Sequence, residues 1–324
     1  MVTRHLISTL DTIRESFNLS DDCEITLEAN PESFSSEDAR LLAAAGFTRV
    51  SIGVQSFDED LLDILGRAHD ADSAWTALRS AKEAGLRVSA DLMLGLPISL
   101  KQAMTKERWD ILLTLVDHVS VYPLTVEEGT ELEKREVAGK FQQSSEEIVA
   151  DEVVYLEALL DSRGFTRYEI SSYARPGQES RQNQRYWLGG DYLGFGLSAS
   201  SMLNQSDGSR KRFVMYDDME DFLDDPEAKR WVQFDPAEYE ALTPGEARRE
   251  DIMLALRTKR GASAQAIAAA GLIPVCDELV EKGLLEVTVL EATTEAGSCE
   301  YYRCTGQGWL LANIVFAAVW LSSN

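Results

Sequence analysis

The stretch "VSIGVQSFDEDLLDILGRAHD", residues 50–70, decides the fold. It begins with strict alternation, in which Val50, Ile52 and Val54 share one face and the opposite face is Ser51, Gly53 and Gln55. A strand of an open doubly wound sheet is covered by helices on both sides and needs two apolar faces. This strand has only one. It therefore favours a sheet that packs against helices on one side and faces a ligand-holding lumen on the other.

Three further predicted strands, residues 23–31, 86–97 and 118–125, repeat this asymmetry, and predicted helices separate them. A last strand of this part of the chain is predicted over residues 166–173. Alternation of strands and helices at this spacing predicts a parallel sheet, and helices on one side only predict a barrel of βα units. The carboxyl ends of the strands then converge at one rim, where barrel sites form. The polar residues at those ends are Glu28, Gln55, Asp91 and Tyr122.

The remainder of the chain changes character after about residue 215. We predict a partial βα barrel over 1–215, an acidic connection over 216–243 and a small α+β domain over 244–324. Three short helices followed by a β-hairpin make the last domain winged-helix-like. Its third helix carries Asp277, Glu278 and Glu281, which would repel phosphates, so we expect an interaction or lid role instead of DNA binding.

Composition narrows the function classes. The net charge of −24 and a pI near 4.5 make nucleic acid and anionic membranes poor partners. The longest apolar run, 309–321, is shorter than the roughly 20 residues that cross a bilayer. The chain starts without a signal-peptide pattern, and its four cysteines are scattered, as expected for a protein of a reducing cytoplasm. Three histidines offer little for a histidine-based metal site.

Four motifs together resemble one family. "LEANPES", "RVSIGVQSFDEDLLDILGRAH", "DLMLGLP" and "YEISSYARPG…NQRYWLGGDYLGFGLSA" are similar to radical S-adenosylmethionine (SAM) proteins related to oxygen-independent coproporphyrinogen III oxidase. "EANP" and "GRAH" favour the branch of HemW-type haem chaperones over the oxidase. The resemblance implies a (β/α)6 radical-SAM-type barrel, partial and truncated here, with SAM above a [4Fe–4S] cluster. It places Glu28, Gln55, Arg67 and Asp91 at SAM. Carboxylates and an amide suit the ligand's ammonium and hydroxyl groups, and an arginine suits its carboxylate.

The cluster-binding part of the family pattern is missing. The family carries a C-x3-C-x2-C loop after its first strand and a "GGGTP" turn after its second, and this sequence contains neither. Cys23, Cys276, Cys299 and Cys304 have the wrong spacing for the three thiolates that a cluster requires. By this resemblance the sequence begins at the helix after the second strand. We expect residues 23–31 to form an uncovered sheet edge, and the isolated chain to be poorly soluble or loosely folded.

The resemblance also concerns haem. The family pattern H-N-x-x-Y, proposed for haem binding, aligns with "QNQRY", which keeps Asn183 and Tyr186 but has Gln182 in place of the histidine. An amide is a weaker iron ligand than an imidazole, so haem binding here would depend on Tyr186.

Three functions therefore stay open. The first is a HemW-type protein of haem trafficking, which hands haem to an acceptor protein. The second is an oxygen-independent coproporphyrinogen III oxidase of porphyrin biosynthesis. The third is a non-catalytic remnant scaffold. Whether the chain is an enzyme is left undecided, because it lacks the cysteines for radical SAM chemistry. The coding sequence upstream of Met1 would separate a misplaced start from a remnant.

Overall fold

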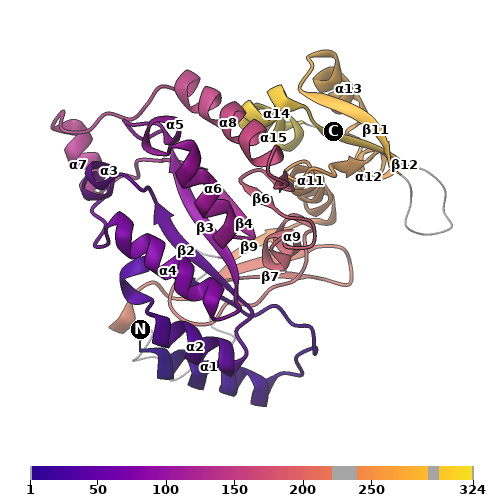
Figure 1. The fold of residues 1–324 in the computed structure, drawn as a ribbon. Helices are drawn as coiled ribbons and strands as arrows, with labels where there is room; N and C mark the ends of the chain where they lie inside the picture. Colours follow the sequence, from indigo (N-terminus) through magenta and orange to yellow (C-terminus); the bar gives the residue numbers. More distant parts are fainter. Residues whose placement is uncertain (1, 221–238, 291–298, 323–324) are drawn as a thin grey trace. The chain divides into compact units, whose positions relative to one another are not determined.

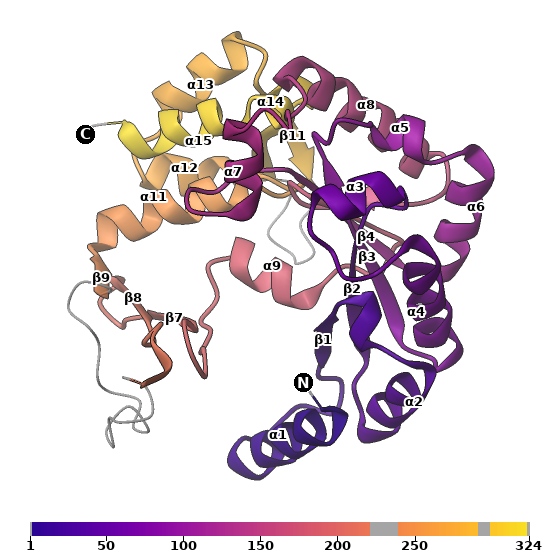
Figure 2. The ribbon, with the colours of Figure 1, turned by 90° about the vertical axis from the view of Figure 1, so that its left-hand side faces the viewer.

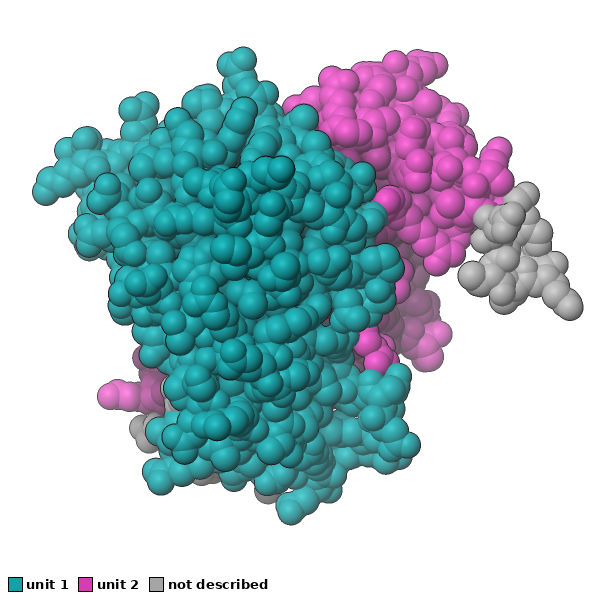
Figure 3. Space-filling model, viewed as in Figure 1, with its two compact units in different colours: residues 1–179 teal, residues 180–324 magenta. Residues whose placement is uncertain are grey.

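The computed structural model describes residues 2–220, 239–290 and 299–322. The chain divides into two compact units, Met1–Glu179 and Ser180–Asn324, which Figure 3 shows in two colours. Most of the acidic connection predicted over 216–243 lies outside the described residues. The predicted domain limits 1–215 and 244–324 stay predictions.

A six-stranded sheet forms the centre of the first unit, in the order β1-β2-β3-β4-β6-β5. The first four strands are parallel, and β6 runs antiparallel to both β4 and β5. Their bounds are β1 Thr26–Ala29, β2 Arg49–Gln55, β3 Arg87–Leu94, β4 His118–Pro123, β5 Thr166–Arg167 and β6 Ser172–Ala174. The parallel βα order predicted from sequence is confirmed. Within the described residues β1 and β5 lie at opposite ends of the sheet order, so the sheet is open.

One strand prediction was wrong. The segment 166–173 reads as a single strand, but the chain turns back between β5 and β6. The Tyr168 amide donates to the carbonyl of Ser172 at 3.1 Å, which closes the turn. Local alternation of residue types does not reveal such a reversal, because both short strands keep the same alternation.

Helices cover one face of this sheet, as Figures 1 and 2 show for α2, α4 and α6. The apolar residues of β2, namely Val50, Ile52 and Val54, are fully buried on that side. The helices and the short 3-10 turn of this unit are α1 Thr3–Ser16, η1 Pro31–Ser33, α2 Ser36–Ala45, α3 Glu59–Ile64, α4 Ala71–Glu83, α5 Leu100–Ala103, α6 Lys106–Leu115, α7 Glu131–Val137 and α8 Glu146–Asp161.

Local sequence signals fix where these helices begin and end. Ser35 and Asp38 form a reciprocal capping box at the start of α2, which satisfies two amides that have no partner within the helix. Gly46 ends the same helix at a φ of +97°, a conformation that costs glycine little. The α2 helix thereby returns the chain to the start of β2.

The opposite face of the sheet is polar, and we call it the lumen face. Cross-strand pairing arranges its residues in three rows that advance toward the carboxyl ends of the strands. The rows are Thr26–Arg49–Arg87, then Glu28–Ser51–Ser89–His118, then Asp91–Ser120–Ser172. The predicted division of each strand into an apolar and a polar face is confirmed.

The second unit contains two small sheets. The strands β7 Ser200–Asn204, β8 Arg210–Val214 and β9 Tyr239–Leu242 form one antiparallel sheet, and β10 Ala262–Ser263, β12 Cys299–Cys304 and β11 Leu285–Leu290 form the other. The helices are α9 Arg181–Trp187, α11 Pro244–Ala255, α12 Ala264–Ala269, α13 Ile273–Glu281, α14 Gly306–Leu310 and α15 Ala312–Leu321. Three helices followed by the β11–β12 hairpin match the winged-helix-like arrangement expected from the sequence.

In the part of the chain that the structure describes, no helix is both long enough and apolar enough to span a membrane.

Candidate ligand-binding site

The carboxyl end of β2 adopts an unusual backbone conformation. Gln55 has a φ of +62°, which is rare for a residue other than glycine, and the pairing with β3 shifts register between Ile52 and Gln55. Such strain persists only where surrounding contacts impose it, and it concentrates at functional sites. The shift brings the Gln55 amide back over Gly53: a Cβ added at Gly53 would lie 3.0 Å from Gln55 Nε2.

Arg67 joins Gln55 at the same point. Its guanidinium donates to Asn30 Oδ1 at 2.6 Å and to the carbonyl of Gly53 at 3.4 Å. A Cβ at Gly53 would also lie 3.3 Å from Arg67 Nη2 and 3.4 Å from Asn30 Oδ1. Because Gly53 has no side chain, the Gln55 amide, the Arg67 guanidinium and the Asn30 amide can come together above it. Sequence reasoning missed Asn30, although it is the third residue of the "EANP" motif.

A buried histidine supports this corner. His69 Nε2 lies 3.2 Å from the carbonyl of Val54, and Nδ1 lies 3.2 Å from Glu32 Oε2. The His69 side chain is fully buried, and it links the end of β2 to η1, the turn after β1. It therefore holds the strained Gln55 backbone. Its position two residues after Arg67 was the only sequence signal.

The other two predicted residues, Glu28 and Asp91, lie on the lumen face on either side of Ser51. Ser51 donates to both Asp91 oxygens, at 3.0 and 2.9 Å, and Ser51 is also the register partner of Glu28. Burial raises the pKa of Asp91, with a smaller contribution from the charge of Glu28. Hydrogen bonds from Ser51 and Ser120, and the charge of Arg49, oppose the rise. A buried carboxylate with incomplete compensation favours a cationic or hydrogen-bond-donating ligand.

A chain of hydrogen bonds leads from Asp91 into the unit. The Ser89 hydroxyl lies 3.4 Å from Asp91 Oδ1 and 2.8 Å from His118 Nδ1, and His118 Nε2 lies 2.9 Å from the Tyr168 hydroxyl. Burial, and then the charge of Arg49, hold the pKa of His118 well below its usual 6.5. A neutral His118 that donates from Nδ1 and accepts at Nε2 satisfies every member of this chain.

Tyr122 completes the rim. Partial burial raises the pKa of its hydroxyl, and the negative charges of Asp91, Glu169 and Glu28 raise it further. The charge of Glu28 acts on Asp91, and the charges of both act on Tyr122, while the convergence of the three side chains on one ligand stays a prediction.

Two buried hydroxyls of the lumen face have no hydrogen-bond partner in the described structure, Thr26 Oγ1 and Ser172 Oγ. An unsatisfied buried polar atom costs about 1–3 kcal/mol, so a set of them on one face favours a polar ligand there. A hydroxyl-rich zwitterion such as SAM fits this donor set. Glu28, Gln55, Arg67 and Asp91 would hold it, and SAM would supply a sulfonium-activated adenosyl or methyl group.

An iron–sulfur cluster does not fit this chain's described residues. Cys23 precedes β1, whereas Cys276, Cys299 and Cys304 belong to the second unit, and all four thiols are free. Among the described residues, no three cysteine, histidine or acidic side chains lie close enough together to hold a metal ion. We therefore derive no step through a cluster.

The two haem-motif residues lie on α9 in the second unit. The Ser180 hydroxyl donates to Asn183 Oδ1 at 3.2 Å as part of the cap of α9. Tyr186 is 38% exposed, its hydroxyl accepts from Gln182 Nε2, and its ring packs edge-on against Tyr192 at 4.9 Å between centroids. The Tyr186 hydroxyl is thus already hydrogen-bonded to Gln182, and this bond would have to break before the oxygen could bind an iron ion.

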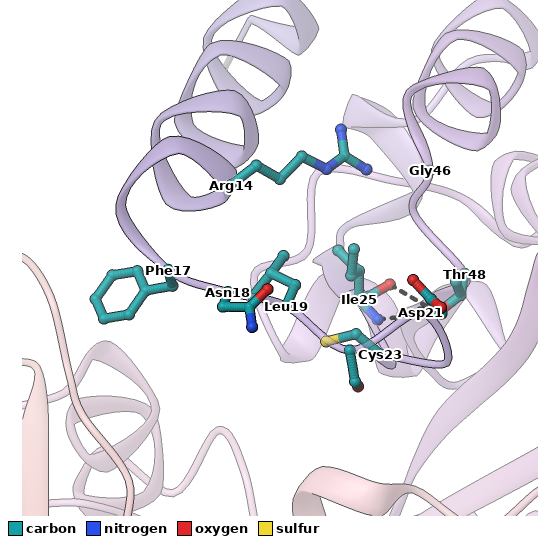
Figure 4. Close-up of a pocket in the computed structure, with 10 residues that line it drawn as sticks. Arg14, Phe17, Asn18, Leu19, Asp21, Cys23, Ile25, Gly46 and Thr48 are labelled. Carbon is teal, nitrogen blue, oxygen red and sulfur yellow. Dashed lines mark hydrogen bonds between the residues drawn. The ribbon is translucent and has the colours of Figure 1, made fainter.

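A separate pocket of about 500 Å³ lies at the opposite, amino-terminal end of β1 and β2 (Figure 4). Its lining residues are Arg14, Phe17, Asn18, Leu19, Ser20, Asp21, Cys23, Ile25, Gly46 and Thr48. Thr48 Oγ1 accepts from the Ile25 amide at 2.9 Å, so part of its polar lining is already bonded. None of the predicted site residues lies in this pocket.

Comparison with known proteins shows the family to which this chain is related. Residues 4–107 match the model of the radical SAM superfamily. The haem chaperone HemW of Bacillus subtilis is 32% identical over 307 residues, which cover 92% of this chain and 76% of that protein. HemW of Escherichia coli is 38% identical over 201 residues, 61% of this chain and 52% of the relative. The bovine mitochondrial radical S-adenosyl methionine domain-containing protein 1 is 39% identical over 193 residues, 59% of this chain and 44% of that protein. The aligned parts thus span about half the length of the latter two relatives.

A solved structure, coproporphyrinogen III oxidase (HemN) of Escherichia coli, superimposes with a TM-score of 0.73 over 99% of this chain and 75% of that one. At 20% sequence identity this match shows the fold alone. It confirms the predicted radical-SAM-type barrel architecture.

Proposed function

The chain belongs to the HemW-type family of radical SAM proteins, and from this premise we propose that it is a haem-handling protein with a SAM site on its lumen face. The observation that carries the proposal is the double cluster at the carboxyl ends of β1, β2 and β3. Glu28 and Asp91 meet there at Ser51, and Gln55 and Arg67 meet at Gly53.

Each group of this cluster has a suitable partner on SAM. The two carboxylates suit the ammonium and ribose hydroxyls, the Gln55 amide suits a hydroxyl or carboxylate, and the Arg67 guanidinium suits the carboxylate. Water would be excluded from Asp91 when the ligand covers it, because the carboxylate is already partly buried. Radical chemistry would need a cluster that this chain's described residues do not hold, so we propose binding and transfer for this chain.

The haem role of this chain rests on its family. Relatives are named haem chaperones, and the α9 motif keeps Asn183 and Tyr186. We propose that Tyr186 binds haem iron once Gln182 releases its hydroxyl, and that an acceptor protein in the cytoplasm then receives the haem.

The SAM proposal is tested by titration calorimetry of SAM into the chain and into an Arg67→Met variant. We expect saturable one-to-one binding, and a loss of roughly tenfold to hundredfold in the variant, because a charge-assisted hydrogen bond is removed. Arg79→Met serves as the control, since Arg79 lies on α4 over the ring of Trp75. Equal affinities for all three proteins would contradict the site.

The haem proposal is tested by titrating haemin into the chain and two variants. We expect Gln182→His, which restores the family pattern, to bind haemin more tightly, and Tyr186→Phe to lose the Soret shift. A Soret shift that persists in Tyr186→Phe would show that Tyr186 is not the haem ligand. Decarboxylation of coproporphyrinogen III by the wild-type chain would overturn the proposal in favour of the oxidase.

A further inference from the structure

Arg49 is the first residue of β2, and 5% of its surface is exposed. Its backbone amide donates to the carbonyl of Ile25 at 3.1 Å, but its side chain forms no hydrogen bond, ion pair or ring contact with any residue that the structure describes. Arginine is almost never buried without a partner, because removing a guanidinium from water costs several kcal/mol unless charges or acceptors replace the water. This residue therefore needs an explanation.

The Arg49 side chain lies on the lumen side of the sheet. It shares a face with Ser51, and its charge acts on two other lumen residues. It opposes the effect of burial on the pKa of Asp91, and it adds to the effect of burial on the pKa of His118. The charge of the guanidinium thus acts on both side chains, and no hydrogen bond or ion pair joins it to either of them.

Its row of the lumen face has an excess of positive charge. Arg49 pairs in register with Thr26 on one side and Arg87 on the other. Arg87 donates to Glu24 at 2.8 Å, and the Glu24 side chain is only 5% exposed. Thr26 contributes a buried hydroxyl without a hydrogen-bond partner in the described structure. Of these two neighbouring arginines only Arg87 is bonded to a carboxylate, and the Thr26 hydroxyl lies in register beside the unbonded side chain of Arg49.

We propose that Arg49, with the Thr26 hydroxyl beside it, binds a carboxylate group of a ligand that enters the lumen. The identity of that ligand rests on the proposed function, but the carboxylate site does not. The carboxylate has two possible sources: a propionate of a tetrapyrrole, or the amino-acid end of SAM, whose single carboxylate Arg49 would then bind in place of Arg67. A guanidinium forms two parallel hydrogen bonds with either.

The first test needs no ligand and compares two register neighbours. We expect Arg49→Met to keep or raise the midpoint of urea unfolding, because a largely buried guanidinium without a hydrogen bond is replaced by an apolar side chain of similar length. We expect Arg87→Met to lower the midpoint, because it breaks the ion pair to buried Glu24. An equal loss in both variants would show that Arg49 serves the fold, and would overturn the proposal.

The second test uses propionate ion as the probe. Sodium propionate should raise the unfolding midpoint of the wild-type chain above that in sodium chloride of equal ionic strength. The increase should saturate, be weakened in Arg49→Lys, vanish in Arg49→Met and survive in an Arg87→Lys variant. Equal responses to propionate and chloride in the wild type would overturn the proposal, whether or not the chain binds haem or SAM.

The last test separates the two sources. If a propionate is bound, Arg49→Met should lose roughly tenfold to hundredfold in haemin affinity and leave the affinity for haemin dimethyl ester unchanged. If the amino-acid end of SAM is bound, the variant should lose affinity for SAM but not for methylthioadenosine. Unchanged affinities for all four compounds would overturn the proposal. A wild-type chain that binds none of them but responds to propionate would contradict only the proposed function.

Discussion

Arg210 in the second unit and Arg49 in the first are almost equally buried, with 3% and 5% of their surfaces exposed, but their surroundings differ. Arg210 forms ion pairs with Glu250 and Asp251 and donates to Asn204 Oδ1 at 3.0 Å. Arg49 has none of these partners. The first arginine connects β8 to α11 and has a structural role. The second lies on a face whose polar groups are incompletely bonded, which is why we propose a binding role for Arg49 and a structural role for Arg210.

The largest expected effect tests the structural side of this comparison. Arg210→Met should lower the free energy of unfolding by about 3–5 kcal/mol, because it leaves buried Glu250 with fewer bonds and removes the connection to α11. Urea unfolding followed by circular dichroism measures this loss. Arg303→Met, which breaks the exposed pair with Glu286, should cost less than about 1 kcal/mol. Similar losses in both variants would contradict the structural role of Arg210.

A second prediction concerns pH and His118. The pKa of His118 lies below 6.5 in the folded chain, so the unfolded state binds the proton first as the pH falls. Stability is therefore complete above about pH 6.5 and decreases below it, by at most roughly 1.4 kcal/mol per pH unit until the folded pKa is reached. The groups around this imidazole are Arg49, Ser89 and Tyr168.

His118→Gln should remove this component of the pH dependence, as measured by urea unfolding between pH 7.5 and 5.5. The difference between wild type and variant separates the contribution of His118 from that of Asp91, because the raised pKa of Asp91 makes the fold more stable as the pH falls. A difference that stays constant over this range would show that folding does not lower the pKa of His118.

A third prediction reverses the usual sign of a core substitution. Asp91→Asn should stabilise the ligand-free chain at pH 7 by about 1 kcal/mol, since the buried carboxylate destabilises the fold above its raised pKa. The gain should shrink as the pH falls through that pKa, because the wild-type carboxyl then becomes neutral as well. Asp117→Asn is the matched control: Asp117 accepts from Lys82 Nζ at 2.9 Å, so its variant should be less stable. A destabilised Asp91→Asn would mean that the carboxylate serves the fold.

The smallest expected change in stability is that of Gly53→Ala. The added methyl group would lie 3.0 Å from Gln55 Nε2 and 3.3 Å from Arg67 Nη2, so these flexible ends must move apart. We expect about 1 kcal/mol or less in stability but roughly tenfold weaker SAM binding, measured by calorimetry. Gly306→Ala is the control, because a methyl group there meets no atom within 4 Å. Unchanged SAM affinity in Gly53→Ala would show that Gln55 and Arg67 do not contact the ligand.

The sequence predicted much of this arrangement because strand alternation is a local signal. This alternation places the polar residues Ser51, Asp91 and Glu28 on the same face of the sheet. They lie near one another because the strands are parallel. Arg49 and His69 were missed for the opposite reason. An arginine that begins a strand is usually exposed at its end, and a histidine after a helix has no periodic signal, so only the three-dimensional packing shows that both are buried.

The reversal between β5 and β6 was missed because it depends on β4. The β6 strand pairs antiparallel with β4 through Ser120 and Ser172, and no pattern within 166–173 encodes a distant partner. The strained φ of Gln55 is likewise imposed by its surroundings, which include the His69 contact to Val54.

We propose that the incompletely bonded groups of the lumen face bind SAM. Equilibrium dialysis of radiolabelled SAM against the wild-type chain and a Glu28→Gln/Asp91→Asn double variant tests it most directly. We expect the wild-type chain to bind one SAM saturably. The double variant should bind SAM about a hundredfold or more weakly, and it should be no less stable to unfolding than the wild type. Equal binding by the two proteins, or none by the wild type, would contradict it.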